Sequence, residues 1–355
     1  MLPNLAPAAV ANRIEELRKQ LGSRITILGH HYQDDSVIKH VDLRGDSLEL
    51  ARKVEDIDSE HIVFCGVYFM AESAALLARP GQKVHLPEMS ANCVMAQMAP
   101  AALAETILEK CNSGGRKVIP LAYVNSSVAI KGITGKFGGA VCTSANATPM
   151  MEWALRQGDA VLFLPDKNLG WNTADLLGIP EAERHILNIR ANGGEMDMDA
   201  VNAARLILWP GCCAIHARFN TRQIASRRAE HPKGRVVVHP ECSPAVVAGA
   251  DAAGSTSYII EYVEQAQKGD TVIVGTEINL VERLAEQYKN TFTIVPLLES
   301  ECSHMDRTKP AHLLMALESI ADPDAGWPSC AVAVDQAIKA DATASLARML
   351  QEMQQ

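Results

Sequence analysis

Three cysteines stand just beyond short apolar runs and could together hold a metal centre. Cys213 follows the run 206–208 and a Pro-Gly break, Cys93 follows the run 83–87, and Cys302 follows the run 292–296. Three thiolates fit a tetrahedral metal with one open position, or three irons of a cubane 4Fe–4S cluster whose fourth iron is left for substrate. Such an open iron is a Lewis acid that helps water to leave. Each cysteine alone could equally be a buried packing residue.

The composition indicates an acidic globular chain. Its 355 residues are 48% hydrophobic and 21% charged, and the formal net charge is −9. A nucleic acid or an anionic membrane would need a basic face, so we expect neither as a partner. The N-terminal residues lead directly into a charged amphipathic helix rather than a signal peptide. Nine cysteines in such a chain fit reduced thiols or metal ligands, and we expect a cytoplasmic protein.

One pattern of strands and helices occurs three times along the chain. Its short apolar strands are expected at 24–28, 61–66 and 84–86, then at 117–122, 160–164 and 206–209, and finally at 235–238, 271–274 and 292–295. Strands that alternate with helices in this way predict parallel sheets with helices on both faces. We therefore predict an α/β fold of three similar αβα three-layer units with short parallel sheets, related by a pseudo-threefold axis. The alternative is that unrelated βα units simply look alike.

The predicted domains are residues 1–100, 101–215 and 216–355. The last of these also carries two C-terminal helices, expected at 311–320 and 331–353.

Polar residues follow the first strand of each unit, where parallel sheets bind their ligands. They are His30 and Tyr32 in the first unit, Tyr123 and Asn125 in the second, and His239 and Glu241 in the third. Two titratable groups two residues apart on an extended segment can face one cavity, so Glu241 beside His239 is the best acid/base candidate. A histidine in such a place can also be only a structural hydrogen-bonding group.

Hydroxyl residues stand at a predicted helix start in each unit: Ser47, Thr143-Ser144 and Ser255-Thr256. The free N–H groups and hydroxyls of a helix start can bind a carboxylate or a phosphate even in an acidic protein. The same residues could be plain N-caps, and Asp46 could cap the first of these helices instead of Ser47.

A set of short motifs runs through the chain in a fixed order: GHHYQ, GDSLELA, MAESA, ANCVMA, AYVNSS, VCTSANA, LPDKNLG, WPGCCAIH, HPEC, ADAAGSTSYI, VGTE and ECSHM. Together they resemble the quinolinate synthase family over essentially the whole sequence. The resemblance implies a triplicated fold and an iron–sulfur transferase of NAD biosynthesis, which condenses iminoaspartate with dihydroxyacetone phosphate to quinolinate, phosphate and water. It also implies a possible partner in the enzyme that supplies iminoaspartate.

The resemblance further implies roles for individual residues. The ligands of a 4Fe–4S cluster fall on Cys93, Cys213 and Cys302, and catalytic acid/base roles fall on Tyr32, His239 and Glu241. Substrate-binding roles fall on His30, Ser47, Tyr123, Asn125, Ser144, His216, Ser255 and Thr256. The chain departs from the family in two ways: Cys212 adjoins the expected ligand, and Cys302 lacks the C-x-x-C that some members carry.

Two other functions remain open on the residues alone. One is a different iron–sulfur hydro-lyase that acts on a small hydroxy acid, which would form no pyridine ring. The other is a non-enzymatic iron–sulfur sensor, against which the many acid/base residues at strand ends argue.

Overall fold

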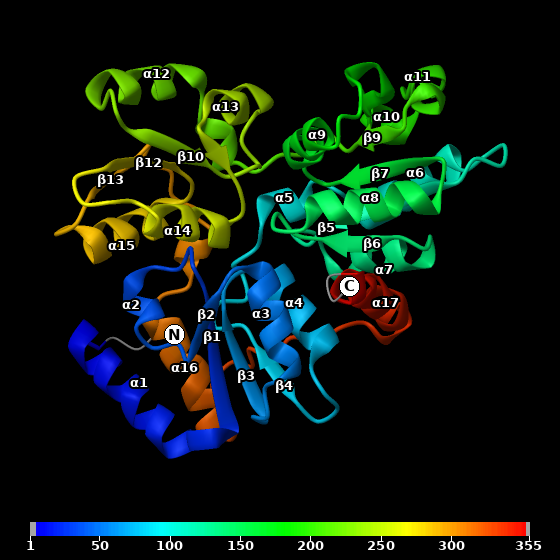
Figure 1. Ribbon diagram of the computed structural model, residues 1–355. Coiled ribbons are helices and arrows are strands. Elements are labelled where there is room, and N and C mark those ends of the chain that lie inside the picture. The colour runs from blue at the N-terminus through cyan, green and yellow to red at the C-terminus, as the bar shows by residue number, and fades with distance from the viewer. Residues whose placement is uncertain (1–4, 353–355) are drawn as a thin grey trace. The chain divides into compact units, whose positions relative to one another are not determined.

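The computed structural model describes residues 5–352, which form three parallel sheets flanked by helices (Figure 1). All nine predicted strands are present, each sheet drawing three of them from one of the three repeats, and every strand pair in the sheets is parallel. The predicted α/β fold class with three αβα units is confirmed. By compactness the chain forms two units, and the limits predicted at 100/101 and 215/216 stay a prediction. The first compact unit holds the chain up to Cys93, Glu277–Arg283 and Glu301–Val334, and the second holds Val94–Thr276, Leu284–Ser300 and the chain from Asp335.

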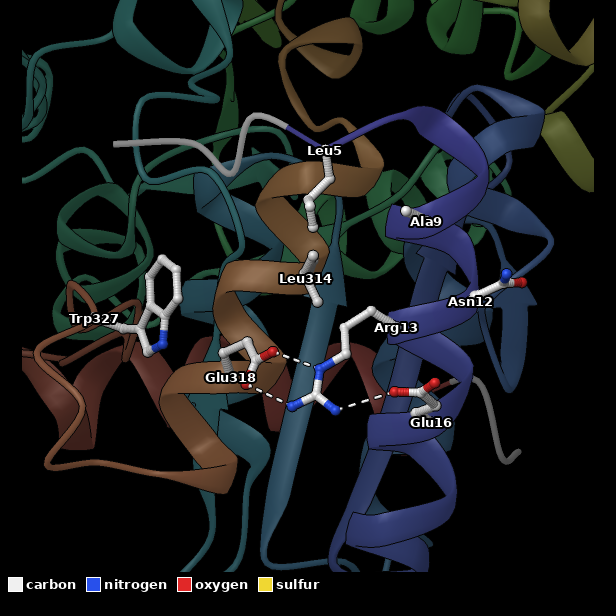
Figure 2. A pocket seen from close by; sticks show the side chains of 8 residues that line it. All are labelled: Leu5, Ala9, Asn12, Arg13, Glu16, Leu314, Glu318 and Trp327. Atoms are coloured by element: carbon white, nitrogen blue, oxygen red, sulfur yellow. Dashed lines mark hydrogen bonds and ion pairs between the residues drawn. The ribbon is translucent and has the colours of Figure 1, made fainter.

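The first sheet has the strand order β2-β1-β3-β4. Its strands are β1 (Ile25–His30), β2 (Leu43–Gly45), β3 (His61–Cys65) and β4 (Lys83–His85), and its helices are α1 (Pro7–Leu21), α2 (Asp35–Ile38), α3 (Ser47–Glu55), α4 (Tyr68–Leu77) and α16 (Pro310–Ala321). One face of the sheet is buried by α1 and α16, through a cluster that includes Leu17, Val63 and Leu317. Figure 2 shows how Arg13 of α1 clamps Glu318 of α16 with two hydrogen bonds, at 2.8 and 3.2 Å.

The second sheet has the order β6-β5-β7-β9-β8. Its strands are β5 (Val118–Tyr123), β6 (Ala140–Cys142), β7 (Ala160–Leu164), β8 (Arg184–Ile186) and β9 (Leu206–Leu208). Its helices are α5 (Val94–Gln97), α6 (Ala101–Cys111), α7 (Val128–Lys136), α8 (Ala147–Gln157), α9 (Lys167–Leu176), α10 (Arg190–Gly193), α11 (Met198–Ala203) and α17 (Gln336–Glu352). Helices α6 and α7 share a core with β5 and β7, while α8 and α9 pack against each other and the strands.

The third sheet has the order β11-β10-β12-β13. Its strands are β10 (Arg235–Val238), β11 (Ala252–Ala253), β12 (Thr271–Gly275) and β13 (Thr293–Pro296), and its helices are α12 (Thr221–Glu230), α13 (Pro244–Gly249), α14 (Thr256–Glu264) and α15 (Ile278–Tyr288). A core around Ile224, Val236 and Val246 joins α12 and α13 to the sheet.

Four short edge strands, β2, β6, β8 and β11, are additional to the prediction, and all but β8 precede a predicted helix start. Strand β2 runs into Ser47, β6 runs toward Ser144, and β11 runs toward Ser255. Their registers pair His30 with Gly45, Tyr123 with Cys142, and Val238 with Ala253. The edge strands therefore bring each hydroxyl-bearing segment beside the end of the first strand of its own sheet.

Two helix limits differ from the prediction. Helix α8 begins at Ala147 after the N-cap Asn146, so Thr143-Ser144 lies in the preceding turn, where Asn146 Oδ1 accepts the Thr143 N–H at 2.6 Å. The last helix begins at Gln336 instead of residue 331, because Ala331 forms an antiparallel bridge with His85 at the edge of the first sheet. Its predicted end, Met353, lies outside the described residues.

Among residues 5–352, no helix combines the length and the apolar character that a membrane crossing requires.

Candidate active site

Two histidines, a glutamate and a tyrosine form a buried network beyond the ends of β5 and β10. His216 Nδ1 lies 2.6 Å from a carboxylate oxygen of Glu241, and His216 Nε2 lies 3.1 Å from the Thr276 hydroxyl. The imidazole of His216 stacks on that of His239 with centroids 4.4 Å apart and planes 17° from parallel. The Tyr123 hydroxyl donates a hydrogen bond to Glu241. The structure thus brings together four residues that the sequence predicted, and adds Thr276.

The loop that carries His239 and Glu241 is held from outside its own sheet. Asn168 of α9 donates its side-chain amide to the Glu241 carbonyl at 3.1 Å. Asn172, one turn later, donates to the carbonyls of Pro240 and Cys242 at 2.8 and 2.9 Å. These amides satisfy buried carbonyls that follow β10, so helix α9 fixes the path of the loop.

Burial and charge set the ionisation of this network. Burial, together with the neighbouring His216, lowers the pKa of His239 to about 3. Burial by itself would raise the pKa of Glu241, but His239, His216 and the Tyr123 hydroxyl outweigh it and hold that pKa well below its ordinary value. A neutral imidazole beside a carboxylate is an arrangement that can donate and accept protons at neutral pH.

The histidine tautomers follow from the backbone contacts. The Glu241 N–H points at His239 Nδ1 at 3.3 Å, and the Tyr32 N–H points at His30 Nδ1 at 3.1 Å. Each Nδ1 therefore accepts a hydrogen bond, so the neutral ring carries its proton on Nε2. The same local turn recurs in the first and third repeats.

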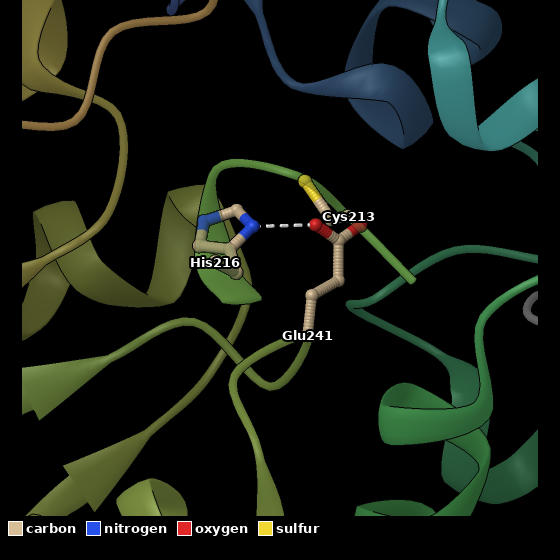
Figure 3. Close-up of side chains that lie close together, drawn as sticks. All are labelled: Cys213, His216 and Glu241. Carbon is tan, nitrogen blue, oxygen red and sulfur yellow. Dashed lines mark hydrogen bonds and ion pairs between the residues drawn. The ribbon is translucent and has the colours of Figure 1, made fainter. Parts of the chain in front are cut away.

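Cys213 adjoins the network (Figure 3). Its Sγ, a ring nitrogen of His216 and a carboxylate oxygen of Glu241 all lie within 4.8 Å of one another. The amide of the neighbouring Cys212 instead faces the sulfur of Met98 at 3.5 Å. Of the two adjacent thiols, it is Cys213 that reaches the histidine and glutamate.

The tight turn before these thiols requires a glycine. A Cβ on Gly211 would lie 2.5 Å from the carbonyl oxygen of Pro165, a distance that side chains do not tolerate. Gly211 therefore lets the loop after β9 approach the loop after β7 closely.

The nine cysteines divide into two classes by exposure. Cys93, Cys212, Cys213 and Cys302 are partly exposed, whereas Cys65, Cys111, Cys142, Cys242 and Cys330 are buried. Burial raises the pKa of the Cys65 thiol to about 12 and that of Cys330 to about 11. Because metals bind the thiolate, the partly exposed set is the one suited to ligation, and it contains all three predicted ligands.

The remaining predicted residues fall into smaller groups. In the first compact unit, the ring of Tyr32 packs edge-on against His30 at 4.7 Å, and the Tyr32 carbonyl accepts a hydrogen bond from Asn279 at 3.2 Å. Ser47 is the first residue of α3, and Asp46 is the N-cap that accepts from Leu48 and Glu49. Ser47 is therefore not the cap, and its hydroxyl is not used in capping the helix.

In the second compact unit, Ser144 lines a cavity of about 390 Å³ together with Asn172, Pro240 and the segment 251–254. Ser255 caps α14 by accepting the Tyr258 N–H at 3.3 Å, and Thr256 is the first helical residue. The Oδ1 atom of Asn125 is buried and has no hydrogen-bond partner among the described residues.

Comparison with known proteins places this geometry in a family. Residues 12–351 match the model of the family described as Quinolinate synthetase A protein. The chain belongs to this family. A quinolinate synthase of Corynebacterium glutamicum is 43% identical over 343 residues, covering 95% of this chain and 86% of that protein. Quinolinate synthases of Lysinibacillus sphaericus and Streptomyces coelicolor are 43% and 41% identical, each covering 98% of this chain and 94% and 90% of their own length. The predicted resemblance is confirmed, and the chain is an enzyme of the quinolinate synthase type.

Two buried acids of this quinolinate synthase family member were missed by sequence reasoning. Burial and the charge of Glu241 raise the pKa of Asp166, and burial raises the pKa of Glu277 to about 7. Asp166 stands in LPDKNLG and Glu277 in VGTE, each between a strand and a helix. A carboxylate there reads as an ordinary N-cap, and only the recurrence of an acid at the same place in two repeats could have singled it out.

Proposed function

We propose that the chain is a quinolinate synthase that condenses iminoaspartate with dihydroxyacetone phosphate, forming a carbon–carbon bond and releasing quinolinate, phosphate and water. The observation that carries the proposal is the buried network of His239, His216, Glu241 and Tyr123 beside the thiol of Cys213. An enzyme that makes iminoaspartate would have to supply this unstable imine. The cytoplasmic location stays a prediction.

We also propose that Cys93, Cys213 and Cys302 hold a 4Fe–4S cluster through three of its irons. In support, the loop that follows the last predicted strand carries a partly exposed thiol in each repeat, with two of them, Cys212 and Cys213, in the second repeat, whereas burial disfavours the thiolate at Cys65 and Cys330. When bound, the cluster supplies a Lewis-acidic iron for the final dehydration.

The acid/base residues act around that centre. His239 carries its proton on Nε2 and can donate it in a hydrogen bond to a substrate oxygen, in the manner of a neutral histidine electrophile. Glu241 is the carboxylate that accepts protons, and the Tyr123 hydroxyl and His216 stabilise its charge. Tyr32, next to His30, is the third group that we assign to proton transfer.

Anionic substrate groups need local donors in this acidic protein. At the N-terminal ends of α3 and α14, where the caps already accept the amides of Leu48, Glu49 and Tyr258, the hydroxyl groups of Ser47, Ser255 and Thr256 are the donors for carboxylate or phosphate oxygens. Ser144 and Asn125 provide further polar contacts beyond β5 and β6. His30 completes the set beyond β1.

The proposal is tested by anaerobic iron and sulfide analysis together with an assay for quinolinate. Wild type should bind about four irons per chain and form a pyridine product from the two substrates. Cys93→Ser, Cys213→Ser and Cys302→Ser should each lose the cluster, while Cys212→Ser, the matched control, should keep it. A cluster that survives in Cys213→Ser, or a loaded enzyme that forms no pyridine ring, would overturn the proposal.

Glu241→Gln tests the acid/base assignment separately. The variant should keep its iron and lose at least about 100-fold in turnover, because general acid–base catalysis typically contributes that much. Full turnover in a loaded Glu241→Gln enzyme would remove Glu241 from the mechanism.

A further inference from the structure

In two repeats the loop that carries a proposed ligand cysteine accepts a backbone hydrogen bond from the first amide of a neighbouring helix. The first amide of α4, from Tyr68, donates to the carbonyl of Ala91 at 2.8 Å. The first amide of α9, from Lys167, donates to the carbonyl of Gly211 at 2.9 Å. Ala91 and Gly211 each stand two residues before a cysteine, Cys93 and Cys213. The contact therefore recurs at equivalent positions of the first and second repeats.

A buried carboxylate adds a second tie in the second repeat. Asp166 is the N-cap of α9, and its Oδ1 accepts the amides of Asn168 and Leu169 at 2.8 and 2.9 Å. Its other oxygen, Oδ2, accepts the amide of Cys213 at 3.1 Å. One carboxylate thus caps the helix with one oxygen and holds the cysteine with the other.

The third repeat uses the same arrangement with a longer side chain. Glu277, fully buried, accepts the amide of Asn279 on Oε2 at 2.9 Å and also that of Leu280. Its Oε1 accepts the amide of Cys302 at 3.2 Å. The Glu277 carboxylate therefore accepts the second and third amides of α15 and the amide of Cys302. Asp166 accepts the corresponding amides of α9 and of Cys213.

The first repeat differs at this place. The residue before α4 is Val67, whose side chain makes no capping hydrogen bond. A plain N-cap role would predict no relation between the acid and the cysteine loop. Instead, both acids reach the amide of the residue that we assign as a cluster ligand, and neither is exposed to water.

We infer that Asp166 and Glu277 are positioning residues that fix the loops of Cys213 and Cys302 before the cluster is assembled. The inference rests on the proposed cluster ligands. Each carboxylate holds the cysteine backbone in place so that the thiol needs little ordering when iron arrives, whereas the loop of Cys93 relies on a backbone contact. Preorganisation of this kind raises the affinity of a metal site without any new metal ligand.

The two oxygens of Asp166 allow a variant that separates the roles. In Asp166→Ser the single hydroxyl oxygen can still cap α9, since serine is among the favoured N-caps, but nothing remains to accept the Cys213 amide. Asp197→Ser is the matched control, because Asp197 caps α11 by accepting the Ala200 amide at 3.1 Å and, among residues 5–352, accepts no amide of a cysteine. Glu277→Ser, which can likewise still cap α15 but is too short to reach the Cys302 amide, is the second test and lies in the other compact unit.

The first readout is hydrogen exchange of the apo protein, which needs no cluster. In Asp166→Ser the amide of Cys213 should exchange at least about tenfold faster, and that of Cys302 should not change. In Glu277→Ser the amide of Cys302 should exchange faster and that of Cys213 should not. Unchanged exchange at both cysteines, or equal acceleration in Asp197→Ser, would overturn the inference.

The second readout is reconstitution with limiting iron and sulfide. Both acid variants should take up less than half the iron of wild type and give an altered electron paramagnetic resonance spectrum when reduced, while Asp197→Ser should match wild type. Faster exchange with normal iron uptake would overturn the role in assembly. Failure of wild type itself to bind iron would refute the proposed cluster but leave the exchange result standing, so the two failures are distinguishable.

Discussion

At the scale of single residues, the site depends on keeping the buried carboxylate of Glu241 ionised. Glu241 is buried and yet is held in its ionised form by two imidazoles and a tyrosine hydroxyl. Removing a hydrogen-bond donor from a buried charged group costs more free energy than removing a hydrogen bond between two neutral groups, because nothing replaces the solvation that the charge then loses. The hydroxyl of Tyr123 is therefore more than a packing group.

We expect Tyr123→Phe to lower quinolinate formation by roughly 10- to 100-fold, since a hydrogen bond to a charged group contributes about 1.5–3 kcal/mol. The aromatic ring and its packing at the end of β5 are retained, so iron content should stay at the wild-type value. Tyr262→Phe is the control. Tyr262 lies on α14, where the guanidinium of Arg235 packs over its ring, and it takes no part in the network. Equal activity in the two variants would refute the role of the Tyr123 hydroxyl.

At the scale of elements, helix α7 supports the loop of Asn125 and is itself covered by α17. The contact is close enough to require glycine. A Cβ on Gly135 would lie 1.9 Å from the carbonyl oxygen of Asp341, and one on Gly132 would lie 3.2 Å from Ile338. Small residues on α7 thus let the backbone of α17 approach it directly.

Gly135→Ala should destabilise this contact by at least about 2 kcal/mol, because the added methyl group meets backbone that cannot move without separating the helices. Chemical denaturation followed by circular dichroism measures the loss. Gly249→Ala is the control, since its Cβ would meet only the end of the Ile224 side chain at 3.3 Å. A stability of Gly135→Ala equal to that of the control would show that α17 shifts without cost.

The main strands and the short edge strands differ in how well the sequence predicts them. The nine main strands could be predicted because each is a short apolar run such as Val236–Val238, buried from both sides. The edge strands β2, β6, β8 and β11 could not, because none of them forms an apolar run that stands apart from the helix start or loop beside it. The strand-end residues His30, Tyr123 and His239 were predicted, but their pairing with the hydroxyl segments depends on those edge strands. The hydrogen bonds from the cysteine amides to Asp166 and Glu277 were missed because each acid, taken by itself, looks like an ordinary N-cap.

At the scale of the whole molecule, buried histidines link folding to pH. His61 Nδ1 lies 2.9 Å from His85 Nε2, and His85 Nδ1 lies 3.6 Å from the sulfur of Cys330. Burial, with smaller contributions from His61 and Lys83, lowers the pKa of His85 from its ordinary 6.5 to about 4. Between pH 6.5 and 4 the unfolded chain therefore binds a proton at His85 that the folded protein does not bind. The contribution of neutral His85 to the stability of the folded protein is complete above pH 6.5 and is lost as the pH falls toward 4.

We expect the titration of His85 to lower the free energy of unfolding of the apo protein by about 2 kcal/mol between pH 7.5 and 5. His85→Gln should show a correspondingly shallower dependence on pH, measured by urea denaturation at each pH. His231→Gln should follow wild type, because His231 lies outside the His61, His85 and Cys330 contacts. Parallel curves for His85→Gln and wild type would contradict the assignment.

Because α16 and α17 complete the two cores, the order in which the chain is synthesised affects when each core can form. The cluster of α1 and β1 is completed by Leu313 and Leu317, and α7 is covered by residues 336–352. A ribosome that has made the first two-thirds of the chain has therefore produced neither finished core. Until residues 310–352 emerge, the apolar faces of α1 and α7 stay open to water and to chaperones, so neither compact unit can complete its core before these residues have been made.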